Sequence, residues 1–310
     1  VDAVRRLGGQ VVLFGESFSD AWRHTLDLIK ETGYVFIPPF DDPDVIAGQG
    51  TIGMEILRQH PDPIHAIFVP IGGGGLAAGV AAYVKNLRPE IRVIGVEPVD
   101  SDAMRRSIMA GHRVELKDVG LFADGVAVKR IGDETFRVLR ENLDEIITCS
   151  NDEICAALKD IFDDTRAIAE PSGALSLAGL KKYVAEHDMT GARTAAILSG
   201  ANMNFHTLRF VSERCEVGEQ REGIISVTIP EKKGAFLDLC RKLGNRMVTE
   251  FNYRFSDPSQ AEIFTSLRLT EGMDELERII ASLREAGYSV TDMTRNTFAK
   301  SHVRYMIGGK

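Results

Sequence analysis

Four consecutive glycines separate an apolar strand-like run from a helical run of small residues within positions 66–79. The turn consists of Gly72, Gly73, Gly74 and Gly75, and Leu76 opens the helical run. Consecutive glycines lose much backbone entropy on folding and supply no side chain for packing. A ligand that lies against bare backbone N–H groups compensates for this loss, most often a phosphate at a helix N-terminus. The pattern therefore predicts a strand–turn–helix unit that binds a phosphate.

Composition restricts the class of protein. The chain has 310 residues, 44% hydrophobic content and a net charge of −8, which predicts a globular protein of two domains. A net negative chain lacks the basic surface that nucleic acid or an acidic membrane would need, so we expect neither partner. The sequence shows neither a membrane-length apolar run nor an export signal, and we expect a cytoplasmic location. The four cysteines are scattered, which predicts no metal site.

Short apolar runs alternate with helical patterns over the first two thirds of the chain. This alternation is typical of βαβ units and predicts a parallel sheet. The expected strands are 11–14, 34–37, 66–69, 91–96, 146–148 and 194–198. The expected helices are 17–31, 46–59, 76–86, one that starts at the capping box of Ser150 and Glu153 and runs to 162, and 173–186.

The pattern changes after residue 215. A charged segment at 216–222 is expected to be a linker between a first domain at 1–215 and a second at 223–295. The second domain has strands at 224–229, 248–255, 262–269 and 289–292 and helices at 235–243 and 274–286. The order β-α-β-β-α-β is that of a ferredoxin-like domain. We expect residues 296–310 to be another linker.

The start of the chain resembles the last turns of a helix. Gly8 stands in the C-terminal cap position of this helix, and neither an initiator Met nor an N-cap precedes it. We therefore expect the chain to begin inside a larger domain.

The glycine run also fits a dinucleotide site. Gly72, Gly74 and Ala77 satisfy G-x-G-x-x-A, and Glu97 ends the next expected strand, where a ribose-binding acid would stand. A P-loop does not fit, because no Lys-Ser/Thr follows the last glycine.

Three further positions are candidate site residues. Ser199 follows a strand and could direct its hydroxyl into the crevice at the sheet edge, or cap the next helix. Glu170 precedes a helix, where it could enter a pocket or stabilise the helix dipole. Gly125 could approach a flat ring or form a plain turn.

These segments together resemble one enzyme family. Residues 72–79, 120–132, 169–174 and 198–206 are similar to the biosynthetic threonine ammonia-lyases, and 211–222 resembles the entry to their regulatory region. The resemblance implies a parallel-sheet pyridoxal-phosphate fold of type II, like that of the tryptophan synthase β chain, followed by an ACT-like regulatory domain. It implies deamination of L-threonine to 2-oxobutanoate and ammonia, the first step of isoleucine biosynthesis, by a homotetramer. A serine-preferring ammonia-lyase is the alternative within the family.

The resemblance also implies the roles of site residues. Gly72, Gly73, Gly74, Gly75 and Leu76 would bind the phosphate of pyridoxal 5'-phosphate, Ser199 would face the pyridine nitrogen, and Gly125 would lie against the cofactor. Glu97 and Glu170 are expected to be pocket residues. A neutral hydroxyl leaves the ring nitrogen largely unprotonated, which favours β-elimination over transamination.

One part of the family pattern does not occur in this sequence. The cofactor-linking lysine lies in a Ser-x-Lys-x-Arg-Gly-type stretch, which the family has upstream of the tetraglycine turn. We therefore expect no catalytic residue in this chain, which resembles the enzyme without its first third and without a second regulatory module. The 310-residue chain alone is expected to have little or no lyase activity. A non-catalytic amino-acid sensor is the alternative from another functional class.

The ACT-like domain carries one candidate effector loop. Pro230 and Gly234 have the spacing of effector loops in such domains, although a plain turn has the same residues. The resemblance implies inhibition by isoleucine, opposed by valine.

Overall fold

The first unit of the molecule is an α/β unit built on a parallel sheet. The structure is a computed structural model, and it describes residues 1–15 and 18–296. Four strands pair in the order β3-β2-β1-β4, all parallel. They are β1 (Ala66–Pro70), β2 (Arg92–Pro98), β3 (Glu145–Cys149) and β4 (Thr194–Ala196). All five residues of β1 are buried, as expected for a central strand that is covered on both faces.

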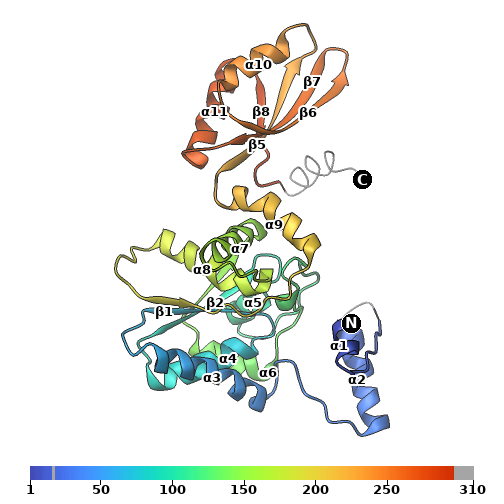
Figure 1. Cartoon of the computed structure of the whole chain (residues 1–310), viewed down its shortest axis with the longest axis vertical. Coiled ribbons are helices and arrows are strands. Elements are labelled where there is room, and N and C mark those ends of the chain that lie inside the picture. Colours follow the sequence, from blue (N-terminus) through green and yellow to red (C-terminus); the bar gives the residue numbers. More distant parts are fainter. Residues whose placement is uncertain (16–17, 297–310) are drawn as a thin grey trace.

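Helices cover both faces of this sheet and produce two hydrophobic cores (Figure 1). One core joins the sheet to α3 (Pro43–Gln59), α4 (Gly75–Leu87), α5 (Ala103–Ala110) and α6 (Asp133–Asn142). The other joins it to α7 (Asn151–Thr165), α8 (Pro171–Glu186) and α9 (Phe205–Gly218). The short helix η1 (Asp124–Val126) lies beside α8. The predicted capping box forms at α7, where Ser150 and Glu153 exchange hydrogen bonds.

The second unit, 222–292, is a four-stranded antiparallel sheet with two helices. Its strands pair in the order β6-β7-β5-β8, the ferredoxin-like order that the sequence predicted. The elements are β5 (Glu222–Pro230), α10 (Ala235–Leu243), β6 (Val248–Asp257), β7 (Gln260–Arg268), α11 (Met273–Glu285) and β8 (Ser289–Asp292). Both helices pack on one face of the sheet and bury a separate core. We call this part the regulatory unit, after the regulatory domain that the family resemblance implies.

The connection between the units is shorter than the charged segment 216–222. Helix α9 continues through Gly218 and β5 begins at Glu222, so three residues separate them. Lys159 on α7 pairs with Glu219 at 3.1 Å, and Arg221 pairs with Glu216 at 3.2 Å. The expected linker at 296–310 lies almost entirely outside the described residues.

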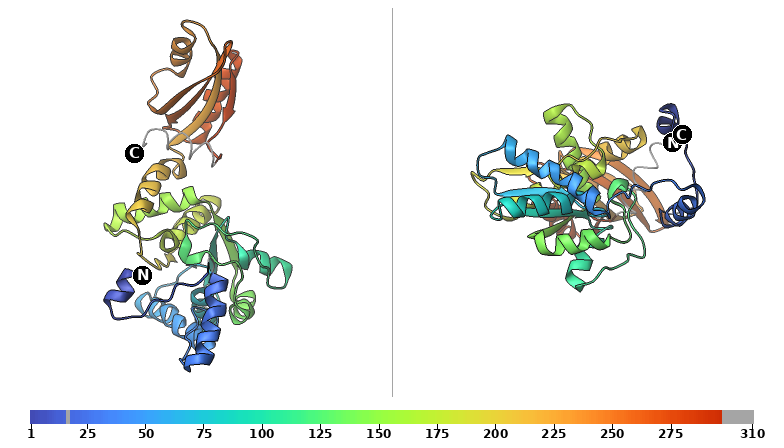
Figure 2. Two further views of the ribbon diagram at one scale, coloured as in Figure 1. Left: turned by 90° about the vertical axis from the view of Figure 1, so that its right-hand side faces the viewer. Right: turned by 90° about the horizontal axis from the view of Figure 1, so that it is seen from below.

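Two strand predictions near the start are wrong. Residues 11–14 and 34–37 form no strand, and apolar side chains among them are exposed, with Val35 86% accessible. Strands need a hydrogen-bonding partner, and none pairs with these segments among the described residues. Helices α1 (Asp2–Arg6) and α2 (Phe18–Thr32) form and lie away from the sheet (Figure 2). Within the described part of the chain, no helix has the length and apolarity that a membrane crossing requires.

Candidate functional site

The strand order creates one point where the chain reverses its direction across the sheet. From β1 the chain moves outward to β2 and β3, and it returns on the opposite side of β1 as β4. The carboxyl ends of β1 and β4 are therefore neighbours, and Ile197 donates a backbone hydrogen bond to the Phe68 carbonyl at 3.1 Å. Open α/β sheets bind ligands in the crevice at such a switch point. The tetraglycine turn follows β1, and Ser199 follows β4.

The tetraglycine turn holds a row of unpaired backbone donors. Among the described residues, no hydrogen bond is donated by the N–H groups of Gly72, Gly73, Gly74 or Gly75, although Gly73, Gly74 and Gly75 are buried. Buried N–H groups are rarely left without an acceptor, because each loses its bond to water. The turn leads into α4, so the helix dipole adds positive potential there. This arrangement fits a phosphate group.

Close packing makes the glycines necessary. A Cβ on Gly73 would overlap the Phe40 ring, and a Cβ on Gly72 would lie 2.9 Å from the Val126 Cα. Gly74 has φ of +100° and forms the N-cap of α4. A Cβ there would stand 2.9 Å from the Thr135 Cβ. Real Cβ contacts are essentially never this short, so each position excludes alanine as the structure stands.

The motif at 169–174 contacts the motifs at 120–132 and 198–206. A Cβ on Gly125 would stand 2.9 Å from the Ser172 Oγ, so η1 and the start of α8 are in contact. The Ser199 hydroxyl donates to the Ser172 carbonyl at 3.5 Å. The Glu170 N–H donates to the Gly200 carbonyl at 3.1 Å. Gly125, Glu170 and Ser199 are thus brought together from three segments, and Val126 connects them to Gly72.

Burial changes the acidity of Glu170. Loss of solvent raises the pKa of this carboxyl, and the negative charge of Asp124 acts in the same direction. The Asn202 N–H partly opposes the rise. Ser199 itself is exposed, so its hydroxyl is accessible at the switch point.

Glu97 makes a different contact from the one a dinucleotide site requires. Its two carboxylate oxygens accept the N–H groups of Met104 at 2.9 Å and Arg105 at 2.8 Å, at the start of α5. The side chain is fully buried, and desolvation raises its pKa to about 8. Because both carboxylate oxygens already accept backbone N–H groups, Glu97 is not free to bind a ribose as the dinucleotide-site alternative requires.

Sequence reasoning missed four residues that support this site. Phe40 packs on the turn, Asp41 accepts the N–H groups at the start of α6, and Thr135 donates to the Gly73 carbonyl at 2.7 Å. The fourth is Ser172, whose buried Oγ has no hydrogen-bond partner among the described residues. Phe40, Asp41 and Thr135 are 30 or more positions from the turn, so no local pattern marks them.

Lysines of the α/β unit are engaged away from the turn. Lys85 pairs with Asp144 at 2.7 Å, Lys182 with Glu153 at 3.5 Å, and Lys181 with Asp160. Lys129 donates to the Lys117 carbonyl at 3.0 Å. Within the described ranges, no group of three or more His, Cys, Asp or Glu is arranged to hold a metal ion.

The predicted effector loop is an exposed turn. Pro230 ends β5, and Gly234 has φ of +91° and forms the N-cap of α10. Both are exposed, and the neighbouring Glu231 accepts a hydrogen bond from the Tyr253 hydroxyl. Phe236 on α10 lies 4.9 Å from Phe251 on β6, centroid to centroid, and both remain partly accessible.

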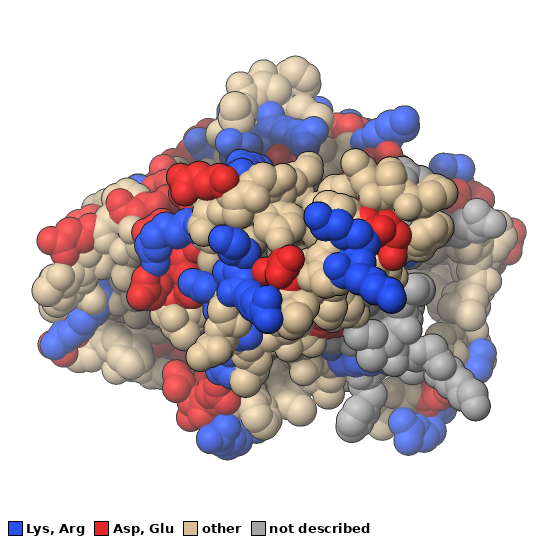
Figure 3. Space-filling view, turned by 90° about the horizontal axis from the view of Figure 1, so that it is seen from above, with Lys and Arg blue, Asp and Glu red and all other residues tan. Residues whose placement is uncertain are grey.

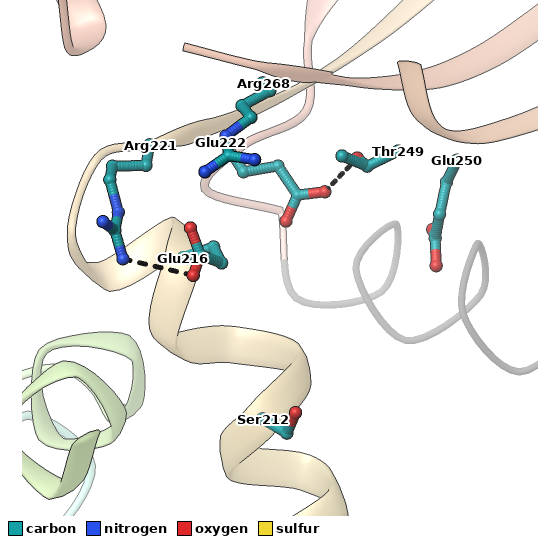
Figure 4. A pocket seen from close by; sticks show the side chains of 7 residues that line it. All are labelled: Ser212, Glu216, Arg221, Glu222, Thr249, Glu250 and Arg268. Carbon is teal, nitrogen blue, oxygen red and sulfur yellow. Dashed lines mark hydrogen bonds and ion pairs between the residues drawn. The ribbon is translucent and has the colours of Figure 1, made fainter. Parts of the chain in front are cut away.

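A charged cleft of about 300 Å³ lies where α9 meets the regulatory unit (Figure 4). Two arginines, three glutamates and two hydroxyl side chains line it: Arg221, Arg268, Glu216, Glu222, Glu250, Ser212 and Thr249. The Thr249 hydroxyl donates to Glu222, and Arg221 pairs with Glu216. On the outer face of the regulatory unit, basic and acidic side chains are likewise interspersed (Figure 3).

Comparison with known proteins agrees with the fold. The chain belongs to the family of pyridoxal-phosphate dependent enzymes, which matches residues 1–200. Residues 213–303 match the C-terminal regulatory domain of threonine dehydratase. These two matches confirm the predicted fold class and the predicted family resemblance.

The curated relatives of this chain include several threonine dehydratases. The chain is 57% identical over 310 residues to the biosynthetic L-threonine dehydratase of Salmonella typhimurium, and the match covers 100% of this chain and 60% of that protein. It is 47% identical to the chloroplastic biosynthetic threonine dehydratase of Arabidopsis thaliana, covering 99% of this chain and 52% of that protein. The chain thus spans about 60% of the length of its bacterial relatives.

Solved structures give the same result. The processed form of threonine deaminase isoform 2 from Solanum lycopersicum is 50% identical, with a TM-score of 0.66, over 68% of this chain and 62% of that one. A second threonine deaminase, from T.th., is 40% identical, with a TM-score of 0.62, over 66% of this chain and 67% of that one.

Proposed function

We propose that this protein is a threonine ammonia-lyase, which converts L-threonine to 2-oxobutanoate and ammonia in the first step of isoleucine biosynthesis. The observation that carries the proposal is the switch point between β1 and β4, where the unpaired donors of the tetraglycine turn, Gly125, Glu170 and Ser199 come together. The names of the relatives support the reaction and the substrate. As domain boundaries we assign residues 1–215 to the cofactor-binding domain, 216–222 to the linker and 223–295 to the ACT-like regulatory domain, which contains all but the first residue of the regulatory unit.

The residues of this chain would hold pyridoxal 5'-phosphate as follows. The N–H groups of Gly72 to Gly75, with Leu76 at the start of α4, would bind the phosphate. Ser199 would meet the ring nitrogen with a neutral hydroxyl, and Gly125 would leave space for the ring. When bound, the cofactor supplies an electron sink for loss of the β-hydroxyl. Burial raises the pKa of the Glu170 carboxyl, so this side chain keeps its proton to a higher pH than an exposed glutamate does.

The regulatory unit would bind amino-acid effectors. We propose that the turn from Pro230 to Gly234 contributes to sites for isoleucine and valine. The partly exposed rings of Phe236, Phe251 and Tyr253 lie beside this turn, and an apolar surface suits a branched aliphatic side chain. We expect a cytoplasmic homotetramer, by resemblance to the family.

Two alternative functions remain as hypotheses: a serine-preferring lyase and a non-catalytic amino-acid sensor. Turnover of L-threonine against L-serine by the complete protein separates the first from the proposal. Calorimetric titration with isoleucine, together with cofactor binding, separates the second. A sensor binds isoleucine and does not bind pyridoxal phosphate.

The replacement Ser199→Ala tests the role of the ring-nitrogen partner. In the complete protein we expect unchanged cofactor content and a fall in kcat of about 10²-fold, the usual effect of removing one preorganised donor. The buried Ser107 hydroxyl, which bonds to the Ala103 carbonyl, provides the control Ser107→Ala. Unchanged kcat in Ser199→Ala would refute the assigned role.

A further inference from the structure

Thr135 is a buried residue whose side chain contacts the tetraglycine turn. It stands in the first turn of α6, its exposed fraction is 0%, and its hydroxyl donates to the Gly73 carbonyl at 2.7 Å. This is a contact between a side chain on α6 and the middle of the tetraglycine turn, 62 positions away in sequence. Most buried hydroxyl groups have a hydrogen-bond partner, and the partner of Thr135 is the turn itself.

The geometry of the peptide unit gives this contact a consequence. The carbonyl of Gly73 and the N–H of Gly74 belong to one peptide unit, and no cis peptide bond occurs among the described residues. In a trans peptide the two groups point in opposite directions. Fixing the Gly73 carbonyl toward Thr135 therefore aims the Gly74 N–H away from α6. That N–H is one of the unpaired donors of the turn.

The position of Thr135 is itself fixed by a second contact. Asp41 accepts the N–H groups of Asp133 and Glu134, both at 2.9 Å, and so caps α6. The adjacent Phe40 packs against Gly73. Residues 40–41 and the start of α6 thus hold the turn from two sides, which restricts the rotation that glycine otherwise allows.

The geometry assigns Thr135 as a positioning residue for the cofactor phosphate, acting through the peptide unit between Gly73 and Gly74. The inference rests on the proposed cofactor site. It concerns the orientation of the peptide unit between Gly73 and Gly74. The four glycines cannot fix this orientation by themselves, because glycine populates positive and negative φ about equally.

The test compares two ligands that differ only in the phosphate. The variant Thr135→Val removes the hydroxyl and keeps the shape of the side chain. Dissociation constants for pyridoxal 5'-phosphate and for pyridoxal are measured by absorbance titration on the 310-residue chain and on the complete protein. We expect the affinity for the phosphorylated ligand to fall about five- to tenfold, the value of one hydrogen bond, and the affinity for pyridoxal to stay within about twofold. Thr135→Ser should recover most of the lost affinity.

The controls separate local from general effects. Thr165→Val removes a hydroxyl that bonds to the Ile161 carbonyl on α7, and it should change neither affinity. Should Thr135→Val fail to fold, Thr135→Cys keeps a similar volume with a weak donor and serves as the second variant. Equal weakening of both ligands, or no weakening of either, overturns the inference alone. Failure of the wild-type complete protein to bind pyridoxal phosphate overturns the proposed function, and the inference with it.

Discussion

Two turns of this molecule begin a helix in the same way and differ in their surroundings. Gly74 before α4 and Gly234 before α10 both form the N-cap, with φ of +100° and +91°, and neither helix has a side-chain cap. Gly74 is buried, and a Cβ there would strike Thr135 and Met104. Gly234 is exposed, and a Cβ there would meet nothing within 4 Å. Glycine is therefore required at position 74 by both the backbone conformation and the packing around it. At position 234 it is required by the backbone conformation alone.

The largest expected effect is that of Gly74→Ala. A left-handed conformation costs a non-glycine residue about 1–2 kcal/mol, and overpacking adds about 1–3 kcal/mol. We expect the α/β unit to lose about 2–5 kcal/mol of unfolding free energy, measured by denaturant titration with hydrogen exchange to assign the unit. A loss as small as that of Gly234→Ala would show that the surroundings of the first turn yield easily, and the contrast between the turns would fail.

The replacement Gly234→Ala is the matched variant in the regulatory unit. Since nothing surrounds the position, only the conformational cost of about 1–2 kcal/mol is expected. Hydrogen exchange in α10 should increase while exchange in α4 stays constant. An effect that reaches α4 would indicate that the two turns are not independent.

Over a single pH unit, a smaller effect distinguishes the stability of the two units. Glu97 lies on β2, which pairs with the strand that precedes the tetraglycine turn. Burial raises its pKa from 4.5 to about 8. The folded state therefore binds a proton that the unfolded state releases, so the α/β unit loses stability as the pH rises through this window. The loss is at most about 1.4 kcal/mol per pH unit.

The variant Glu97→Gln should remove this dependence. We expect its stability relative to wild type to improve between about pH 5.5 and 6.5, as followed by thermal unfolding at each pH. The regulatory unit should show no such difference. A constant gap between variant and wild type across this range would show that Glu97 keeps an ordinary pKa.

The sequence predicted the four strands that form the parallel sheet and the glycine turn that follows β1, because each of these patterns is local. Gly72 to Gly75 and Ser150 with Glu153 act within a few residues, and the structure places them as expected. Glu97 was assigned to the pocket, but a strand-end acid reads the same whether it faces a ligand or caps α5. Thr135 and Asp41 act on partners 62 and 92 positions away, and nothing in their own neighbourhood marks them. Residues 11–14 were expected to form a strand because a short apolar run does not reveal whether a partner strand exists.

Helix α9 connects the candidate cofactor site to the regulatory unit. It begins at Phe205, a few residues after Ser199, and ends three residues before β5. At 14 residues it is about 21 Å long. The bend at its far end is fixed by Gln220, a non-glycine residue with φ of 58°, and by the pairing of Glu219 with Lys159. The loop of Ser199 and the first strand of the regulatory unit are therefore connected by one helix and three further residues.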